Sequence, residues 1–128
     1  MKARHKVALA MIGSFALGAV AVEGLHAQAK PPAYIIAEVG VADPDGYSKE
    51  FLPPVMKTIQ DAGGKFLARG GRTVSFEGAP PAPRVVILQV DSIEKAQAWM
   101  SSPATKDAFA IGKKYATFRQ FAVEGVAQ

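Results

Sequence analysis

The stretch Gly63-Gly64-Lys65-Phe66-Leu67-Ala68-Arg69-Gly70-Gly71 lies between two segments with helical periodicity, and the rest of the chain is arranged around it. Glycine adopts a positive φ without steric cost, so the first glycine pair is suited to end a helix in the left-handed conformation. The five residues between the pairs have strand character. The second pair predicts a bend or bulge in this strand, with Arg69 at its corner.

Hydrophobic periodicity on either side of this stretch predicts a β-α-β-β-α-β order. A first helix begins at Asp43-Pro44, and Pro53-Pro54 kinks or splits it. A second helix begins near Asp91-Ser92, ends near Ser101, and restarts at Ser102-Pro103. The expected strands cover residues 34–41, 65–69 resuming at 72–77, 84–90 and 117–123. The restarted helix is expected to bury Ala104, Ala108, Ile111 and Tyr115.

This order is typical of an α+β protein with the ferredoxin-like βαββαβ fold, an antiparallel sheet with helices on one face. Such a sheet normally presents polar residues on its other face, but segments 34–41 and 84–90 are apolar on both faces apart from Glu38. A second copy of the chain would cover this face. We therefore expect a homodimer of the α/β-barrel type, with two sheets face to face.

Residues 1–29 have the three-part order of an export signal. A basic start at Lys2, Arg4 and Lys6 precedes the uncharged run 7–22, whose 16 residues are fewer than the roughly 20 of a membrane-spanning helix. Ala27-Gln28-Ala29 predicts cleavage after Ala29. We expect a signal peptide at 1–29, an extended leader at 30–33, a single domain at 34–126, and export to the bacterial periplasm. An uncleaved membrane anchor is the alternative.

Composition limits the classes of partner and chemistry. The chain has 128 residues, of which 49% are hydrophobic and 20% charged, which favours a packed globular domain. Removal of residues 1–29 lowers the net charge from +4 to +2, because this segment carries three of the 15 basic and one of the 11 acidic residues. We therefore expect no nucleic-acid partner and no stable membrane insertion after cleavage.

The mature chain has neither imidazole nor thiol. There is no cysteine, and both histidines, His5 and His26, lie in the predicted signal. Catalysis by Ser-His-Asp or Cys-His groups is thereby excluded, as are the commonest ligands of zinc, copper and haem. We expect no cofactor and no metal site.

Several motifs resemble a known family. Tyr47 follows an Asp-Pro helix start, and the glycine-bracketed stretch is followed by Glu77-Gly78, Arg84-Val85-Val86 and Ala98-Trp99 before Ser102-Pro103. Together they resemble the family called domain of unknown function 1330, over roughly Ala33 to Val126. The resemblance implies a dimeric α+β barrel of ferredoxin-like subunits and no established reaction. The wider group of such barrels includes haem-degrading and cofactor-free monooxygenases, lactone isomerases and plain ligand binders.

Three residues are candidates for catalysis. Glu38 interrupts an apolar strand, where a carboxylate would have a raised pKa suited to acid or base work. Arg69 is placed to bind a carboxylate or another anion, and Tyr47 presents a hydroxyl from the inner face of its helix. We predict that Glu38 and Arg69 share a pocket. For Glu38 the alternative is a carboxylate at the sheet edge or an ion pair with an arginine across the dimer. For Arg69 it is an ion pair that holds the bend, and for Tyr47 it is core packing.

Four further residues are candidates for ligand binding. Trp99 presents an indole edge from its helix, with core packing as the alternative. Gly70 and Gly71 offer backbone N–H groups to an anion. Arg84 follows the proline-rich loop, and its alternative role is an ion pair with Glu77 across the hairpin.

Two function classes follow from these candidates. One is an enzyme without histidine or thiol that acts on a small carbonyl-bearing molecule, for example an isomerase or a cofactor-free oxygenase. The other is a non-catalytic exported dimer that binds a small organic anion or another protein. A pocket shared by the polar candidates favours the first, and their dispersal into ion pairs favours the second.

Overall fold

The computed structural model describes residues 30–127, so the predicted signal at 1–29 lies outside the described residues. The folded unit spans Pro31–Val126. Its elements follow the predicted β-α-β-β-α-β order, with both helical segments divided. In chain order they are β1 (Ala33–Val41), α2 (Pro44–Gly46), the π-helical turn η1 (Tyr47–Phe51), α3 (Leu52–Asp61), β2 (Lys65–Arg69), β3 (Arg84–Val90), α4 (Ile93–Ser101), α5 (Pro103–Gly112) and β4 (Ala116–Glu124).

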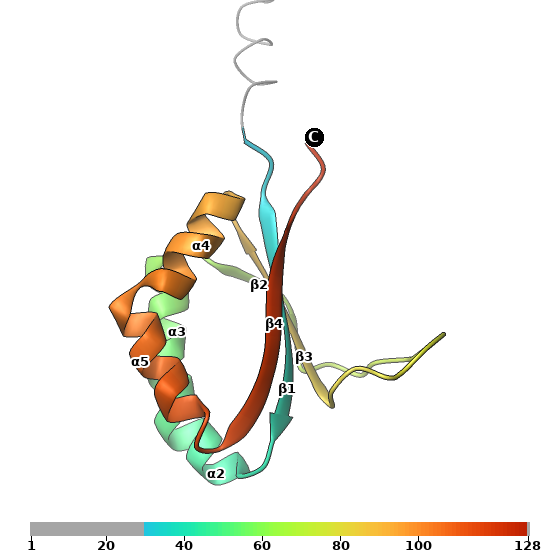
Figure 1. Ribbon diagram of the computed structural model, residues 1–128, viewed down its shortest axis with the longest axis vertical. Helices are drawn as coiled ribbons and strands as arrows, with labels where there is room; N and C mark the ends of the chain where they lie inside the picture. The colour runs from blue at the N-terminus through green and yellow to red at the C-terminus, as the bar shows by residue number, and fades with distance from the viewer. Residues whose placement is uncertain (1–29, 128) are drawn as a thin grey trace, which may run out of the picture. The chain divides into compact units, whose positions relative to one another are not determined.

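The four strands form one antiparallel sheet in the order β2-β3-β1-β4. The helices cover one face of this sheet (Figure 1). The prediction of an α+β, ferredoxin-like fold is confirmed. In the centre of the sheet, Ile36 of β1 lies opposite Ile87 of β3 and Phe121 of β4. No helix within residues 30–127 combines the length and hydropathy of a membrane-spanning segment.

The glycine pairs act much as the sequence indicates. Gly63 has a φ of 72°, and the N–H of Gly64 donates to the carbonyl of Ile59 at 2.9 Å, which ends α3 with a left-handed turn. Gly70 also has a positive φ, of 70°, directly after β2. The β-bulge, however, lies at Leu67 within β2, where the pairing with β3 shifts between Phe66 and Ala68.

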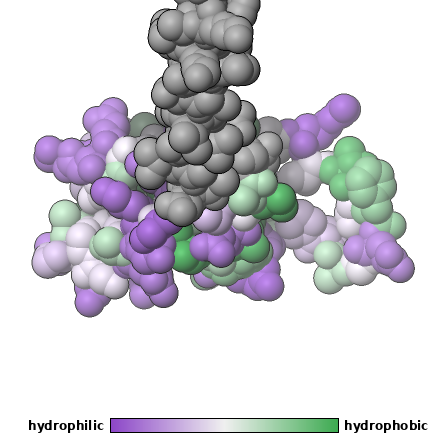
Figure 2. Space-filling model, turned by 90° about the horizontal axis from the view of Figure 1, so that it is seen from above, coloured by the Kyte–Doolittle hydropathy of each residue, from purple (hydrophilic) through white to green (hydrophobic). Residues whose placement is uncertain are grey.

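The prediction that β2 resumes at residues 72–77 is wrong. These residues belong to an exposed loop, residues 70–83, which projects on the side of the sheet away from the helices (Figure 1). The left-handed Gly70 turns the chain out of the sheet, and Pro80, Pro81 and Pro83 on the returning side have no N–H to form a ladder. Hydrophobic and hydrophilic residues lie side by side on this protrusion, at the right of Figure 2, and the Phe76 side chain is 95% exposed.

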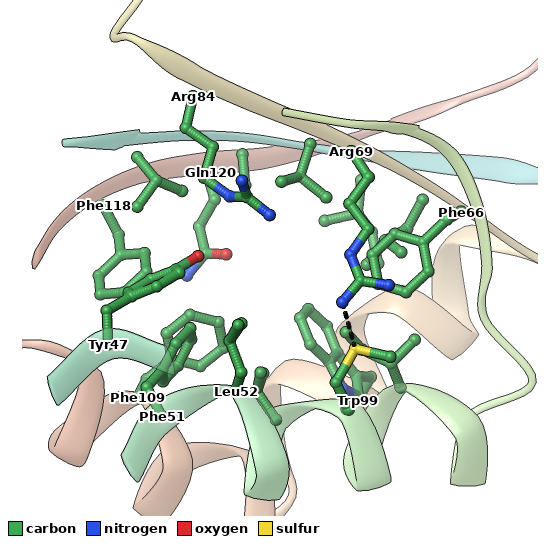
Figure 3. A pocket seen from close by; sticks show the side chains of 18 residues that line it. Tyr47, Phe51, Leu52, Phe66, Arg69, Arg84, Trp99, Phe109, Phe118 and Gln120 are labelled. Atoms are coloured by element: carbon green, nitrogen blue, oxygen red, sulfur yellow. Dashed lines mark hydrogen bonds between the residues drawn. The ribbon is translucent and has the colours of Figure 1, made fainter. Parts of the chain in front are cut away.

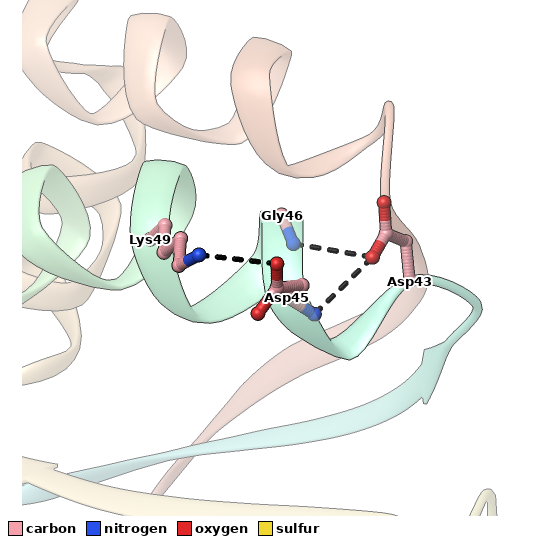
Figure 4. A network of polar contacts seen from close by, with 4 residues as sticks. All are labelled: Asp43, Asp45, Gly46 and Lys49. Carbon is pink, nitrogen blue, oxygen red and sulfur yellow. Dashed lines mark hydrogen bonds and ion pairs between the residues drawn. The ribbon is translucent and has the colours of Figure 1, made fainter.

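The first helical segment contains a π turn where the prolines were expected to kink it. Asp43 caps its start, accepting hydrogen bonds from the N–H groups of Asp45 and Gly46 at 3.2 Å each (Figure 4). Pro53 and Pro54 have no N–H for an α-helical ladder to the preceding turn, and the N–H of Leu52 instead donates to Tyr47 five residues earlier. The predicted break is therefore confirmed.

The stripe predicted for the last helix is partly wrong. The buried residues of α5 are Thr105, Ala108 and Gly112, whereas Ala104 is exposed. Thr105 can be buried because its hydroxyl accepts a hydrogen bond from the Ser102 hydroxyl at 2.8 Å. A buried helix face predicted from apolar residues alone misses a threonine such as Thr105, which can point inward because its hydroxyl is hydrogen-bonded.

An aromatic cluster lies between the sheet and the helices. The Phe51 ring packs against three others, with centroid distances of 5.1 Å to Tyr47, 5.3 Å to Phe109 and 5.2 Å to Phe118. Trp99 contacts Phe109 edge-on, and its indole N–H donates to the Thr58 hydroxyl at 3.0 Å. These rings form one side of the cavity described next.

Candidate functional site

A cavity of about 60 Å³ lies between the sheet and the helix layer. One water needs only about 10–15 Å³ of such space, so the cavity has room for a small ligand group. Its walls are almost wholly apolar, and the polar exceptions are Tyr47, Arg69, Arg84, Trp99 and Gln120 (Figure 3). Of the cavity-lining residues that the structure describes, none is a carboxylate.

Strand alternation and the π turn determine which side chains reach the cavity. Side chains two residues apart in β1, Ile35, Ala37 and Val39, form its floor. The π turn brings Tyr47 and Phe51 to the opposite wall, and both are buried. π turns within helices are frequent at functional sites.

Arg84, the first residue of β3, directs its guanidinium into the cavity (Figure 3). Its Cζ lies 5.9 Å from the centroid of the Tyr47 ring. Its Nε is buried and has no hydrogen-bond partner, and within residues 30–127 no ion pair includes Arg84. The alternative role of Arg84, an ion pair with Glu77, is therefore not found in the structure. A buried donor without a partner is costly, and its presence here indicates a place for an acceptor.

Gly70 makes room for the Arg84 side chain. A Cβ at position 70 would lie 2.4 Å from Nη1 of Arg84, closer than real Cβ contacts allow. The Gly70 N–H donates to the carbonyl of Val85 at 2.8 Å. The prediction that the N–H groups of Gly70 and Gly71 face an anion is wrong for Gly70, whose N–H is already used, and Gly71 lies outside the cavity in the exposed loop.

Arg69, the last residue of β2, enters the cavity from its exposed side. Its Cζ lies 4.5 Å from the centroid of the Phe66 ring, and its Nη2 donates to the sulfur of Met56 at 3.6 Å. A thioether is a weak acceptor. The alternative of an ion pair that holds the bend is not found among the described residues, and the guanidinium remains available to a stronger acceptor.

Gln120 is a cavity residue that the sequence reasoning missed. It lies in β4 two residues after Phe118, on the same face of the sheet, so strand alternation alone would have revealed its orientation. Its amide lies at the same end of the cavity as the Arg84 guanidinium and the Tyr47 hydroxyl, and Arg69 lies at the other end (Figure 3). Three hydrogen-bond donors thus gather at one end.

The prediction that Glu38 and Arg69 share a pocket is wrong. Glu38 alternates with the cavity-lining residues of β1 and lies on the other face of the sheet. There it forms an ion pair with Arg119 of β4 and accepts a hydrogen bond from the Ala82 N–H at 3.0 Å. The Ala82 hydrogen bond, together with Arg119, lowers the pKa of Glu38 below its ordinary value of 4.5, outweighing the opposing effect of partial burial. The raised pKa expected from an apolar strand is therefore also wrong.

The contacts of Glu38 predict a pH-dependent contribution to stability. The pKa of Glu38 is lower in the folded chain than in the unfolded chain. The stabilisation is therefore complete when the pH is above the pKa of the unfolded chain, and it is lost as the pH falls through the pKa of the folded chain. We expect Glu38→Gln to lower the unfolding midpoint in urea at pH 7, with the difference from wild type shrinking below about pH 4. Glu77→Gln in the exposed loop is the control. A difference that is constant with pH would contradict this prediction.

The cavity therefore collects Tyr47, Arg69, Trp99 and Arg84 from the predicted candidates and adds Gln120. The other candidates, Glu38, Gly70 and Gly71, do not line it. Within residues 30–127 no group of three or more aspartate, glutamate, histidine or cysteine side chains is placed to hold a metal ion. The donors fit an anionic or carbonyl oxygen.

Comparison with protein families assigns the chain. The family described as "Domain of unknown function (DUF1330)" matches residues 32–126. The chain belongs to this family. The sequence resemblance to DUF1330 is thereby confirmed. No curated protein matches the sequence of this DUF1330 chain.

Several solved structures resemble this DUF1330 chain. A protein of unknown function from Rhodopseudomonas palustris has a TM-score of 0.56 at 16% identity, covering 82% of this chain and 92% of its own. SnoaB, a cofactor-independent oxygenase from Streptomyces nogalater, has a TM-score of 0.54 at 11% identity, covering 77% and 96%. A hypothetical Arabidopsis thaliana protein has a TM-score of 0.54 at 14% identity, covering 78% and 93%. At such identities the likeness shows a shared fold.

Proposed function

We propose that the cavity binds a small organic anion, with its charged group at Arg84 and its apolar part against the aromatic wall. The observation that carries this proposal is the buried, unpaired Nε of Arg84 in a cavity without a carboxylate. A planar guanidinium forms two parallel hydrogen bonds with a carboxylate, the geometry that an arginine facing an open space is suited to provide. The Gln120 amide and the Tyr47 hydroxyl are additional donors at this end (Figure 3).

Binding without catalysis fits the cavity better than acid-base chemistry. A general base must lie within hydrogen-bond reach of the proton it removes, and among the described cavity residues there is no carboxylate, imidazole or thiol. The chain is therefore proposed as a binding protein for a small organic anion.

A calorimetric titration with hexanoate and with its neutral amide, hexanamide, tests this proposal. The two ligands share the apolar chain, so a preference for hexanoate isolates the contribution of its charge. The fluorescence of Trp99, the only tryptophan, gives a second readout from inside the cavity. We expect hexanoate to bind and hexanamide to bind at least about tenfold more weakly. Equal affinities, or no binding of hexanoate, would contradict the proposal.

A catalytic function is the second candidate. Two guanidinium groups and the Tyr47 phenol in one apolar cavity are a donor set suited to stabilise an enolate, as a cofactor-free oxygenase or an isomerase of carbonyl-bearing molecules requires. SnoaB, which shares the fold, is described as a cofactor-independent oxygenase. Oxygen uptake with an enolisable hydroxyarene, compared between wild type and Arg84→Met, tests this candidate. Uptake that depends on Arg84 would favour catalysis over simple binding.

We also propose that the protein forms a homodimer through the sheet face away from the helices. That face carries apolar residues from three strands, and two of them, Phe121 and Val123, are each 48% exposed in the single chain. The others are Ile36, Val85 and Ile87, which alternate with residues that line the cavity. Such an apolar area on the surface of a small domain is typical of a subunit interface.

Sedimentation velocity at micromolar concentration is expected to show a dimer for the wild-type protein. Ile87→Lys places a charge at the centre of the proposed interface and is expected to give a monomer that still binds hexanoate, because residue 87 points away from the cavity. Lys65→Met, at the margin of the sheet, is the control and should remain dimeric. A monomeric wild type would show that another partner covers this face.

We further propose that the protein is exported and processed after Ala29. The support is the order of basic, apolar and Ala-x-Ala segments in residues 1–29. Intact-mass analysis of protein from the periplasm of a bacterial host is expected to give a chain beginning at Lys30. A mass that retains residues 1–29 would favour the uncleaved anchor instead.

A further inference from the structure

We propose that the natural ligand carries two anionic groups, one at each end of a slender apolar body. This proposal rests on the anion-binding function and adds the class of ligand. It assigns Arg84 to the inner anionic group and Arg69 to the outer one, near the mouth of the cavity.

The two arginines are neighbours on one face of the sheet. Arg69 of β2 lies directly opposite Val86 of β3, and Arg84 precedes Val86 by two residues on the same face. Diagonal neighbours of this kind have Cα atoms about 7–8 Å apart. The described cavity residues include no negative charge to balance the two guanidinium groups. Each of the two guanidinium groups could therefore pair with an anionic group of a ligand.

The side chains of Arg69 and Arg84 extend from these neighbouring positions in different directions. The Arg84 guanidinium lies over the Tyr47 ring, with Cζ 5.9 Å from its centroid, whereas Arg69 reaches the sulfur of Met56 at 3.6 Å. Tyr47 and Met56 are nine residues apart in one helical segment, which corresponds to roughly 13 Å along its axis. The two guanidinium groups therefore lie toward opposite ends of the cavity (Figure 3), which favours a separate anionic group for each.

The space between the two arginines is apolar. Phe51, Leu52 and Val55 line it from the helical segment between Tyr47 and Met56. A volume of about 60 Å³ favours a narrow body such as an alkyl chain. Because Arg84 has a buried Nε and Arg69 is exposed, one end of the ligand is enclosed and the other remains near solvent. Dicarboxylates with an unbranched chain are the simplest molecules with these properties.

Two series of ligands test this inference by calorimetry: the α,ω-dicarboxylates from succinate to suberate, and the monocarboxylates of the same lengths. We expect one length at which the dicarboxylate binds at least about tenfold tighter than its monocarboxylate, because a second charge-assisted contact forms. We expect Arg69→Met to remove this gain, so that the dicarboxylate of that length binds no more tightly than its monocarboxylate. Lys65→Met removes a positive charge from the same strand outside the cavity and should preserve the gain.

The outcomes separate this inference from the anion site itself. If monocarboxylates bind and no dicarboxylate binds more tightly, the second anionic group is refuted and the anion site stands. The same holds if the gain persists in Arg69→Met. If no carboxylate of either series binds, both proposals are refuted.

Discussion

Replacing Arg84 with methionine is expected to weaken hexanoate binding by roughly 10- to 150-fold, while the protein unfolds at the same or a slightly higher temperature. A hydrogen bond to a charged group contributes about 1.5–3 kcal/mol, and a factor of ten corresponds to about 1.4 kcal/mol. Stability should not fall, because Nε of Arg84 is buried without a partner and methionine retains much of the apolar stem. Residues at ligand sites are often not optimal for stability.

Two variants sharpen this experiment. Arg84→Lys keeps the charge but lacks the planar fork, so it should recover only part of the affinity. Arg72→Met removes an arginine from the exposed loop and should bind hexanoate like wild type. If Arg84→Met unfolds at a much lower temperature and binds hexanoate normally, Arg84 is a structural residue and the proposed site is wrong.

Replacing Phe51 with alanine is expected to cause the largest loss of stability, about 3–5 kcal/mol. Its ring contacts the rings of Tyr47, Phe109 and Phe118, and Gly112 lies so near that a Cβ there would come within 2.6 Å of Phe51. The neighbours cannot collapse into the space without moving three other aromatic rings. A domain of this size typically has only about 5–15 kcal/mol of stability, so the loss is a large fraction of the total.

Urea unfolding at one fixed protein concentration measures this loss, because the stability of the proposed dimer would depend on concentration. Phe76→Ala is the matched control. The Phe76 side chain is 95% exposed, so the same substitution there should change stability by less than about 0.5 kcal/mol. Similar effects of the two substitutions would mean that the aromatic cluster around Phe51 contributes little to the core.

The fold was predictable from sequence because its signals are local. Gly63, Pro53 and the cap at Asp43 restrict the backbone within a few residues, and each has the predicted effect. The failure at residues 72–77 is also instructive. Thr73, Val74 and Phe76 have high strand propensity, but a strand needs a partner, and the prolines before Arg84 remove the partner's donors.

The site was only partly predictable, because it depends on which face each strand residue occupies. Glu38 and Arg69 are both polar residues in apolar strands, but the register of β1 turns Glu38 away from the cavity. In β2 the bulge at Leu67 shifts the alternation by one residue, so that Phe66 and Arg69 lie on the same face. Such a shift is not visible in a single sequence.

The contact between Gly70 and Arg84 has a consequence for the evolution of the family. A positive φ alone would admit asparagine or aspartate at position 70, since both tolerate the left-handed conformation. A Cβ at position 70 would lie 2.4 Å from Nη1 of Arg84, so either residue would force the flexible end of the arginine to move from its place in the cavity. The two positions should therefore covary: relatives with arginine at position 84 should keep glycine at 70, and relatives with a small residue at 84 should be free to accept asparagine or aspartate.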